Sequence, residues 1–317
     1  MRRLPQQVPA EARLTAYPHN PRSRAGAIIL AALALIRPAA AQVPADPQLL
    51  ERGRYLATAA NCVGCHTEKD GTEFAGGRAL KTPFGIFYGP NITPDPKAGI
   101  GAWSEREFLD ALKRGVSPDG RPYYPAFPYT SFAGMTDEDA LAIRAFLLSL
   151  PPSDKPSRPH ELSFPYSVRL GLWPWRWLYF DSPPPIPPED ASPQVRRGAY
   201  LVEVLGHCGE CHTPRGWLGA RDDDRRLAGT VDGPEGEKVP NITPDPETGI
   251  ASWSSQDVIR VLETGLLPDF DAVGGPMGEV VRATSKLDPA DRAAIAAYLA
   301  TVPPVSNPQA PATQPEF

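Results

Sequence analysis

The sequence predicts a mainly α-helical fold of two small domains in tandem, each with a few short helices and long loops. Segments 52–67 and 197–213 both contain Arg-Gly-x-Tyr-Leu and end in Cys-x-x-Cys-His-Thr, and segments 90–104 and 240–254 share Pro-Asn-Ile-Thr-Pro-Asp-Pro. Self-similarity of this kind indicates a duplicated structural unit. The chain also has 40 prolines and 27 glycines among 317 residues, which favours loops and short helices.

The first 41 residues are predicted to be a secretory signal peptide. Arg22 and Arg24 precede an apolar run at 25–36, and the alanines at 39–41 offer a small-residue cleavage site. The run is too short to span a bilayer. Removing residues 1–41 takes away six arginines and one glutamate, so the formal charge changes from −5 to −10. We therefore expect an acidic periplasmic protein that does not bind nucleic acid and whose docking partner is basic.

The first domain is predicted at 42–150. Ser104, with Glu107 three residues later, has the pattern of a capping box and predicts a helix that ends at Gly115. Thr136 is the expected N-cap of the closing helix.

Residues 151–193 belong to neither copy and are predicted to connect the two domains as a strap. Flexible linkers are usually polar and rich in Gly or Ser. This segment instead places aromatic side chains among prolines, namely Trp173, Trp175, Trp177, Tyr179 and Phe180. We expect an ordered strap that packs on one or both domains. The alternative is an exposed aromatic patch for a partner.

The second domain is predicted at 194–304 and repeats the helix signals of the first. Ser254 opens a predicted helix that ends at Gly265, and Asp288 followed by Pro289 predicts the start of the last helix. The remaining residues, 305–317, are rich in proline and are predicted to form a disordered tail.

Each copy contains a Cys-x-x-Cys-His motif, the attachment signal for c-type haem. Two thiols three positions apart on one helical turn can add to the two vinyl groups of one porphyrin, and the adjacent histidine then lies beneath the ring and can bind iron. The chain's four cysteines all belong to these motifs, which are Cys62, Cys65 and His66 and then Cys208, Cys211 and His212. Zinc and disulfides are the rival interpretations, but zinc ribbons usually place the second pair of cysteines 15–20 residues away.

The motifs "CVGCHT" and "CGECHTPRG", the paired "PNITPD" segments and the closing "DEDALAIRAFLLSLPP" and "DRAAIAAYL" resemble the multihaem cytochrome c subunits of periplasmic alcohol, gluconate and related dehydrogenases. The resemblance covers nearly all of the chain after the signal peptide. The resemblance does not extend to the third haem domain and the C-terminal membrane anchor of some members, so we expect a two-haem version. The resemblance implies tandem class I cytochrome c domains with iron bound by histidine and methionine.

The same resemblance implies roles for individual residues. His66 and His212 match the proximal ligands, and Met277, in a Gly-Gly-Pro-Met-Gly loop, matches the distal ligand of the second haem. Pro90 and Pro240 precede the two Asn-Ile-Thr segments, and their carbonyls are candidates to accept the other N–H of the proximal histidines. Simple turn prolines are the alternative.

The distal ligand of the first haem is less evident. The position that corresponds to Met277 holds Phe127, which cannot bind iron. After removal of the signal peptide the only other methionine is Met135, which we expect to be this ligand. Against it, Met135 directly precedes the N-cap of the closing helix and aligns with Leu287, an apolar packing residue. Tyrosine ligation through Tyr124 or Tyr129 is a further option, although it would lower the potential of the iron.

The first functional hypothesis is a periplasmic electron carrier. A partner dehydrogenase, in the periplasm or bound to the membrane, would be its donor, and a cytochrome, quinone or oxidase its acceptor. Histidine and methionine together fill the coordination of iron and raise its potential. The alternative is a two-haem enzyme, a peroxidase or a sulfur-compound dehydrogenase, in which the first haem keeps an open or labile position.

Overall fold

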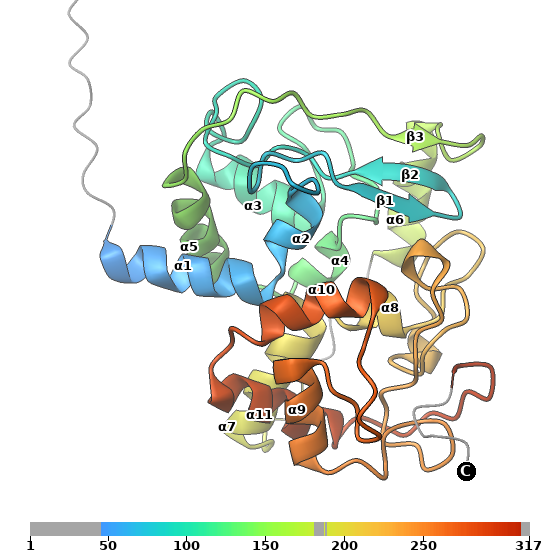
Figure 1. The fold of residues 1–317 in the computed structure, drawn as a ribbon. Coiled ribbons are helices and arrows are strands. Elements are labelled where there is room, and N and C mark those ends of the chain that lie inside the picture. The colour runs from blue at the N-terminus through green and yellow to red at the C-terminus, as the bar shows by residue number, and fades with distance from the viewer. Residues whose placement is uncertain (1–45, 181–186, 188, 312–317) are drawn as a thin grey trace, which may run out of the picture. The chain divides into compact units, whose positions relative to one another are not determined.

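The computed structural model describes residues 46–180, 187 and 189–311 (Figure 1). The predicted signal peptide lies outside the described residues. All described residues belong to one compact unit, Pro44–Phe317. Among them, no helix is long and apolar enough to cross a membrane.

The first half is built from short helices and one hairpin. In chain order these are α1 (Pro47–Ala59), α2 (Cys62–His66), β1 (Ala79–Thr82), β2 (Gly85–Tyr88), α3 (Glu105–Arg114), α4 (Tyr129–Phe132) and α5 (Asp137–Leu148). Helix α3 begins at the predicted capping box of Ser104 and Glu107 and ends at Gly115, whose φ of 59° is the left-handed conformation that glycine adopts without strain. The side chain of Thr136 caps α5 by accepting from the backbone N–H of Asp139.

The second half has helices at the corresponding positions. Its elements are α7 (Pro193–Ala199), η2 (Tyr200–Leu205), α8 (Gly209–His212), η3 (Asp223–Arg225), η4 (Pro234–Gly236), α9 (Ser255–Thr264), α10 (Gly275–Thr284) and α11 (Pro289–Leu299). Segment η2 is a π-helical continuation of α7. Gly53 precedes Cys62 by nine positions, whereas Gly198 precedes Cys208 by ten. The wider π turn accommodates this one extra residue without shifting the motif.

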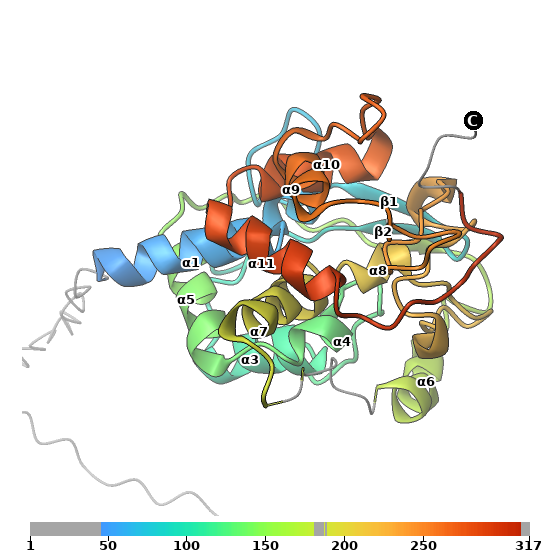
Figure 2. The ribbon, with the colours of Figure 1, turned by 90° about the horizontal axis from the view of Figure 1, so that it is seen from below.

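A glycine lets the first and last helices of each half approach closely. Helix α1 crosses α5 in Figure 1, and α7 lies beside α11 in Figure 2. A Cβ atom on Gly53 would lie 1.9 Å from the carbonyl oxygen of Ala142, and one on Gly198 would lie 1.9 Å from that of Ala294. Both crossings therefore require glycine, and they place the Cys-x-x-Cys-His motifs that follow α1 and η2.

The strap contacts both halves. Its elements are β3 (Glu161–Leu162), η1 (Arg169–Gly171) and α6 (Leu172–Tyr179). Strand β3 adds to the hairpin in the antiparallel order β1-β2-β3, with Gly85 opposite Leu162. The indole Nε1 of Trp175 donates to the carbonyl oxygen of Leu218 in the second half at 2.9 Å. The strap thus packs on both halves, although Trp173 and Trp177 remain exposed.

The two halves contact each other through a reciprocal pair of tyrosines. The hydroxyl of Tyr55 on α1 donates to Asp291 on α11 at 2.6 Å, and the hydroxyl of Tyr200 donates to Asp139 on α5 at 2.7 Å. Each aspartate also binds an arginine of its own half, Arg52 for Asp139 and Arg197 for Asp291. The contact is therefore nearly symmetric, as in an isologous dimer.

The predicted disorder after residue 304 does not hold for the first residues of the tail. The carbonyl oxygen of Val305 accepts from the side-chain amide of Asn241 at 2.7 Å. Asn307 is 5% exposed, and its amide donates to the carbonyl oxygens of Ala228 and Gly229. These polar groups fix the chain against the loop that follows the second motif, which proline content alone did not indicate.

Candidate haem-binding sites

Both Cys-x-x-Cys-His motifs form a single helical turn. Helix α2 contains the whole first motif, and Cys208 is the N-cap of α8, which ends at His212. The residue before each motif, Asn61 or His207, has a left-handed backbone with φ of 46° and 39°. This bend ends the preceding helix and starts the motif turn in a new direction. The two thiols of each motif therefore lie on one turn, as attachment to one porphyrin requires.

The two motif histidines are oriented alike by proline carbonyls. Nδ1 of His66 lies 2.8 Å from the carbonyl oxygen of Pro90, and Nδ1 of His212 lies 2.8 Å from that of Pro240. Since a carbonyl oxygen only accepts, each ring donates through Nδ1 and leaves Nε2 without its proton, ready to bind a metal. Burial lowers the pKa of both histidines, although the bond to the proline carbonyl opposes the shift. The residues present therefore fit a haem iron.

The same backbone arrangement holds each proline in place in the two halves. The N–H of Gly76 donates to the carbonyl oxygen of His66 at 2.8 Å, and that of Gly229 donates to His212 at 2.7 Å. A Cβ atom on either glycine would lie 2.6 Å from the backbone of the proline segment. Buried Asn91 follows Pro90, and its amide donates to the strap carbonyls of Ser153 and Lys155.

The four thiols are free, and Cys62 and Cys208 pack against the apolar core. Burial raises the pKa of Cys62 and Cys208 to about 12 and that of Cys211 to about 11, and it also raises the pKa of Cys65. Among the described residues, no group of three or more histidine, cysteine or acidic side chains could hold a metal ion.

The two motifs lie next to each other. Beyond burial and Glu210, the Cys65 thiol of the first half also raises the pKa of Cys211. The ring of His207, which precedes the second motif, packs edge-on against Phe132 of α4 with centroids 5.5 Å apart. Close motifs give electrons a short route between the two halves.

Glu210, between the two cysteines of the second motif, connects the halves. Its carboxylate accepts from the hydroxyl of Ser131 in the first half and from Arg221, both at 2.9 Å, and it also pairs with Arg215. Burial would raise the pKa of this carboxyl, but Arg215 and Arg221 overcome that effect and lower it to about 2. The sequence reasoning missed Glu210; its only signal was an acidic residue inside one motif where the other has glycine.

Met277 lies in the first turn of α10 and not in a loop as predicted, because Pro276 starts a helix there. Its side chain is partly exposed. Two residues later, Glu279 accepts a hydrogen bond from Arg78 of the first half at 2.7 Å. This bond connects the start of α10 to the residues that follow the first motif. Arg78 also pairs with Glu235 at 3.2 Å.

Phe127 and Met135 occupy apolar positions in the first half. Phe127 packs against Tyr123 and Phe132, with ring centroids 5.8 and 5.9 Å apart. Met135 is 2% exposed and belongs to the same apolar cluster as Cys62. Leu287 is also buried at the corresponding place in the second half, at 4% exposed. Ligation of iron by Met135 stays a prediction.

Comparison with known proteins assigns both halves to one family. The cytochrome c family profile matches residues 50–151 and again 195–303. The chain is 45% identical over 288 residues to a protein described as diheme cytochrome c-type from Cereibacter sphaeroides, covering 87% of this chain and 94% of that protein. This double match confirms the predicted fold class of tandem, mainly α-helical cytochrome c domains.

Two further relatives are subunits of dehydrogenases. The cytochrome c subunit of alcohol dehydrogenase (quinone) from Gluconacetobacter polyoxogenes is 40% identical, with 84% of this chain and 59% of that protein covered. The fructose dehydrogenase cytochrome subunit from Gluconobacter japonicus is also 40% identical, with 84% and 54% covered. The chain therefore spans little more than half the length of these two relatives. The matches in both halves support two covalently bound haem c groups, and the chain belongs to the cytochrome c family as a member with two haem domains.

Proposed function

We propose that the chain is a periplasmic electron-transfer subunit that accepts electrons from a partner dehydrogenase and passes them to an acceptor. The observation that carries this proposal is the pair of adjacent motifs with identically oriented histidines. The names of the relatives, among them cytochrome subunits of alcohol, fructose and gluconate dehydrogenases, support the dehydrogenase as donor. Haem c supplies reversible one-electron oxidation and reduction at its iron.

Residues of the chain hold each haem in place and orient the histidines that would bind its iron. The cysteines would hold each porphyrin by two thioether bonds, and the carbonyls of Pro90 and Pro240 fix the tautomer and ring orientation of His66 and His212. Met277 would hold the second iron from α10, and Met135 would hold the first. Irons held in this way would exchange electrons and would offer no site to a substrate, which suits transfer over catalysis.

The second candidate function is an enzyme in which the first haem keeps an open position. It is favoured by Phe127, which stands where the second half has Met277, and by the packing of Met135 in a position equivalent to that of Leu287. Such a protein would be a peroxidase or a sulfur-compound dehydrogenase.

Spectra of single variants separate the two candidates. Met277→Ala and Met135→Ala should each abolish one thioether-to-iron charge-transfer band in the near infrared and leave the other. If Met135→Ala leaves the spectrum unchanged and the first haem of the wild type is high-spin, the result favours the second candidate function, an enzyme. If rapid mixing with the dehydrogenase and its substrate leaves both haems oxidised, the dehydrogenase is not the donor.

A further inference from the structure

Large apolar side chains are exposed along the strap and in the loop 215–219. We define the aromatic face as eight exposed residues: Phe164, Val168, Leu170, Trp173, Trp177, Leu178, Tyr179 and Trp217. Trp177 is 81% exposed and Trp217 is 80% exposed. Single exposed apolar residues are normal, but a group of this size marks a binding surface or an aggregation hazard.

Helix α6 is apolar on its inner and outer sides. Its inner side packs, because Leu172 is buried and Trp175 hydrogen-bonds to Leu218 of the second half. Leu170, Trp173 and Trp177 follow each other at spacings of three and four and therefore share the outer side. A helix that is apolar all round is expected to be buried. Within the described part of the chain, the outer side of α6 thus lacks the cover that its composition calls for.

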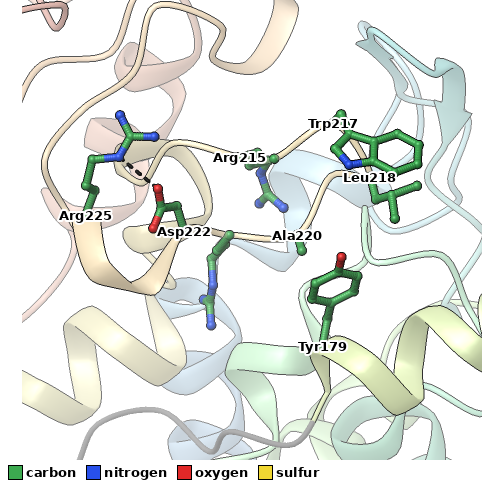
Figure 3. A pocket seen from close by; sticks show the side chains of 9 residues that line it. Tyr179, Arg215, Trp217, Leu218, Ala220, Asp222 and Arg225 are labelled. Atoms are coloured by element: carbon green, nitrogen blue, oxygen red, sulfur yellow. Dashed lines mark hydrogen bonds and ion pairs between the residues drawn. The ribbon is translucent and has the colours of Figure 1, made fainter.

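The loop 215–219 extends the aromatic face toward the second haem motif. Tyr179, Trp217 and Leu218 border a hollow of about 200 Å³, shown in Figure 3. The guanidinium of Arg215 donates to the carbonyl oxygens of Gly219, at 2.7 Å, and Glu210, at 2.9 Å. Because Glu210 lies within Cys-x-x-Cys-His, the loop is held directly against the motif. A partner on the aromatic face would be next to the second haem domain.

The strap part of the aromatic face is uncharged, whereas the hollow beside Trp217 is also bordered by Arg215, Arg221, Asp222 and Arg225. Residues 162–180 contain no aspartate or glutamate. The two arginines of this stretch are used internally, since Arg169 donates to the carbonyl oxygen of Pro122 and Arg176 lies over the ring of Tyr129. The cores of protein interfaces are likewise depleted of charge and enriched in tryptophan and tyrosine. A helix lying on a membrane surface usually presents a face rich in Lys and Arg, which is not present in this stretch.

The exposed area suits a stable protein complex. If a whole aromatic side chain contributes 150–250 Å², the five aromatic residues of the face expose roughly 500–800 Å² at their observed exposures. A standard interface buries about 800 Å² on each partner. The aliphatic residues of the face add to this area, and the hollow beside Trp217 offers a place for a partner's side chain.

We propose that the aromatic face docks the catalytic subunit of the dehydrogenase, through an apolar surface of that subunit, and so places it beside the second haem domain. This inference rests on the proposed function and adds the surface and the half of the chain at which electrons enter. The two most exposed tryptophans, Trp177 and Trp217, are its anchors.

The test uses the full holoprotein, produced as wild type, as the double variant Trp177→Ser/Trp217→Ser and as the control Phe270→Ser. Phe270 is 82% exposed but lies outside the face. Each protein is returned to a strain of the source organism that lacks its own copy, and cell fractions are given ethanol, gluconate or fructose. Haem reduction is followed by absorbance, and the reducing subunit is then purified and titrated against each protein.

We expect the double variant to need at least thirtyfold more catalytic subunit for half-maximal reduction, the effect of losing one hot spot. Haem content, melting temperature and reduction by dithionite should equal those of the wild type and of Phe270→Ser, because both tryptophans are exposed. If the wild type and the double variant give equal titration curves, the proposed docking surface is wrong and the proposed function stands. If no dehydrogenase reduces the wild type, the proposed function is wrong. Flotation of the wild type but not the double variant with phosphatidylethanolamine–phosphatidylglycerol vesicles would assign the face to a membrane instead.

Discussion

Glu210 gives the most quantitative test of how the halves are joined. The change Glu210→Gln removes the carboxylate that pairs with Arg215 and Arg221 and accepts from Ser131 of the first half. The folded protein lowers the pKa of this carboxyl from its ordinary value of 4.5 to about 2. Because a tenfold change in an ionisation constant corresponds to about 1.4 kcal/mol, the charged carboxylate contributes about 3 kcal/mol to the free energy of unfolding at neutral pH.

The sign of the pH dependence follows from the lowered pKa. The stabilisation is fully present above pH 4.5, the unfolded value, and is lost as the pH falls through about 2. Guanidinium unfolding of the holoprotein, followed by Soret absorbance, should show Glu210→Gln less stable than the wild type by about 3 kcal/mol at pH 7. The difference should shrink to about half or less at pH 3.

A surface pair supplies the control for this measurement. Glu51 pairs with Arg54 on the exposed side of α1, and solvent screens such a pair. Glu51→Gln should therefore leave the stability close to that of the wild type at either pH. The role assigned to Glu210 is wrong if its variant is as stable as Glu51→Gln at pH 7, or if the difference from wild type stays constant down to pH 3.

Three further changes test the fold and the second site. Gly53→Ala would place a Cβ atom 1.9 Å from the carbonyl oxygen of Ala142, so the close crossing of α1 and α5 should be lost. The melting temperature of the holoprotein should then fall by many degrees, or little haem-loaded protein should accumulate. Tyr55→Phe removes the bond to Asp291 and should cost about 1.5–3 kcal/mol in denaturant unfolding; a change below about 0.5 kcal/mol would show that this contact is not formed. Met277→Ala should lower the midpoint potential of one haem in a potentiometric titration, and unchanged potentials would remove Met277 from the ligand set.

The features that depend on local sequence were predictable. Capping boxes, glycine ends and Cys-x-x-Cys-His motifs each rest on residues within a few positions, so Ser104, Gly115 and Thr136 were placed as the structure has them. The fold class and the two haem c groups followed from these motifs and from the duplication, and the comparisons confirm both.

The features that depend on contacts between distant segments were not predictable. Strand β3 comes from the strap and pairs with β2 more than 70 residues earlier, and both strands are too short to show an alternating pattern. The Glu210 network and the reciprocal bonds of Tyr55 and Tyr200 each need the relative placement of the two halves, which no periodicity encodes. Met277 was expected in a loop because its glycines obscured the helix start at Pro276.

The strap shows that two alternatives drawn from composition can both describe one segment. Trp175 packs on the second half as expected for an ordered strap, while Trp173 and Trp177 lie exposed as expected for a partner surface. The composition of the strap indicated that its aromatic residues pack on the domains or form a surface for a partner. Only the helical spacing within α6 separates those that pack from those that face solvent.

The proposed function requires that both irons are six-coordinate and serve electron transfer. Near-infrared magnetic circular dichroism of the fully oxidised protein decides this, with the haem concentration fixed by the pyridine haemochrome assay. We predict two low-spin haems per chain, with thioether-to-iron bands whose intensity corresponds to two irons. A stable high-spin haem that reacts with peroxide would refute electron transfer as the sole function and identify the first half as a catalytic site.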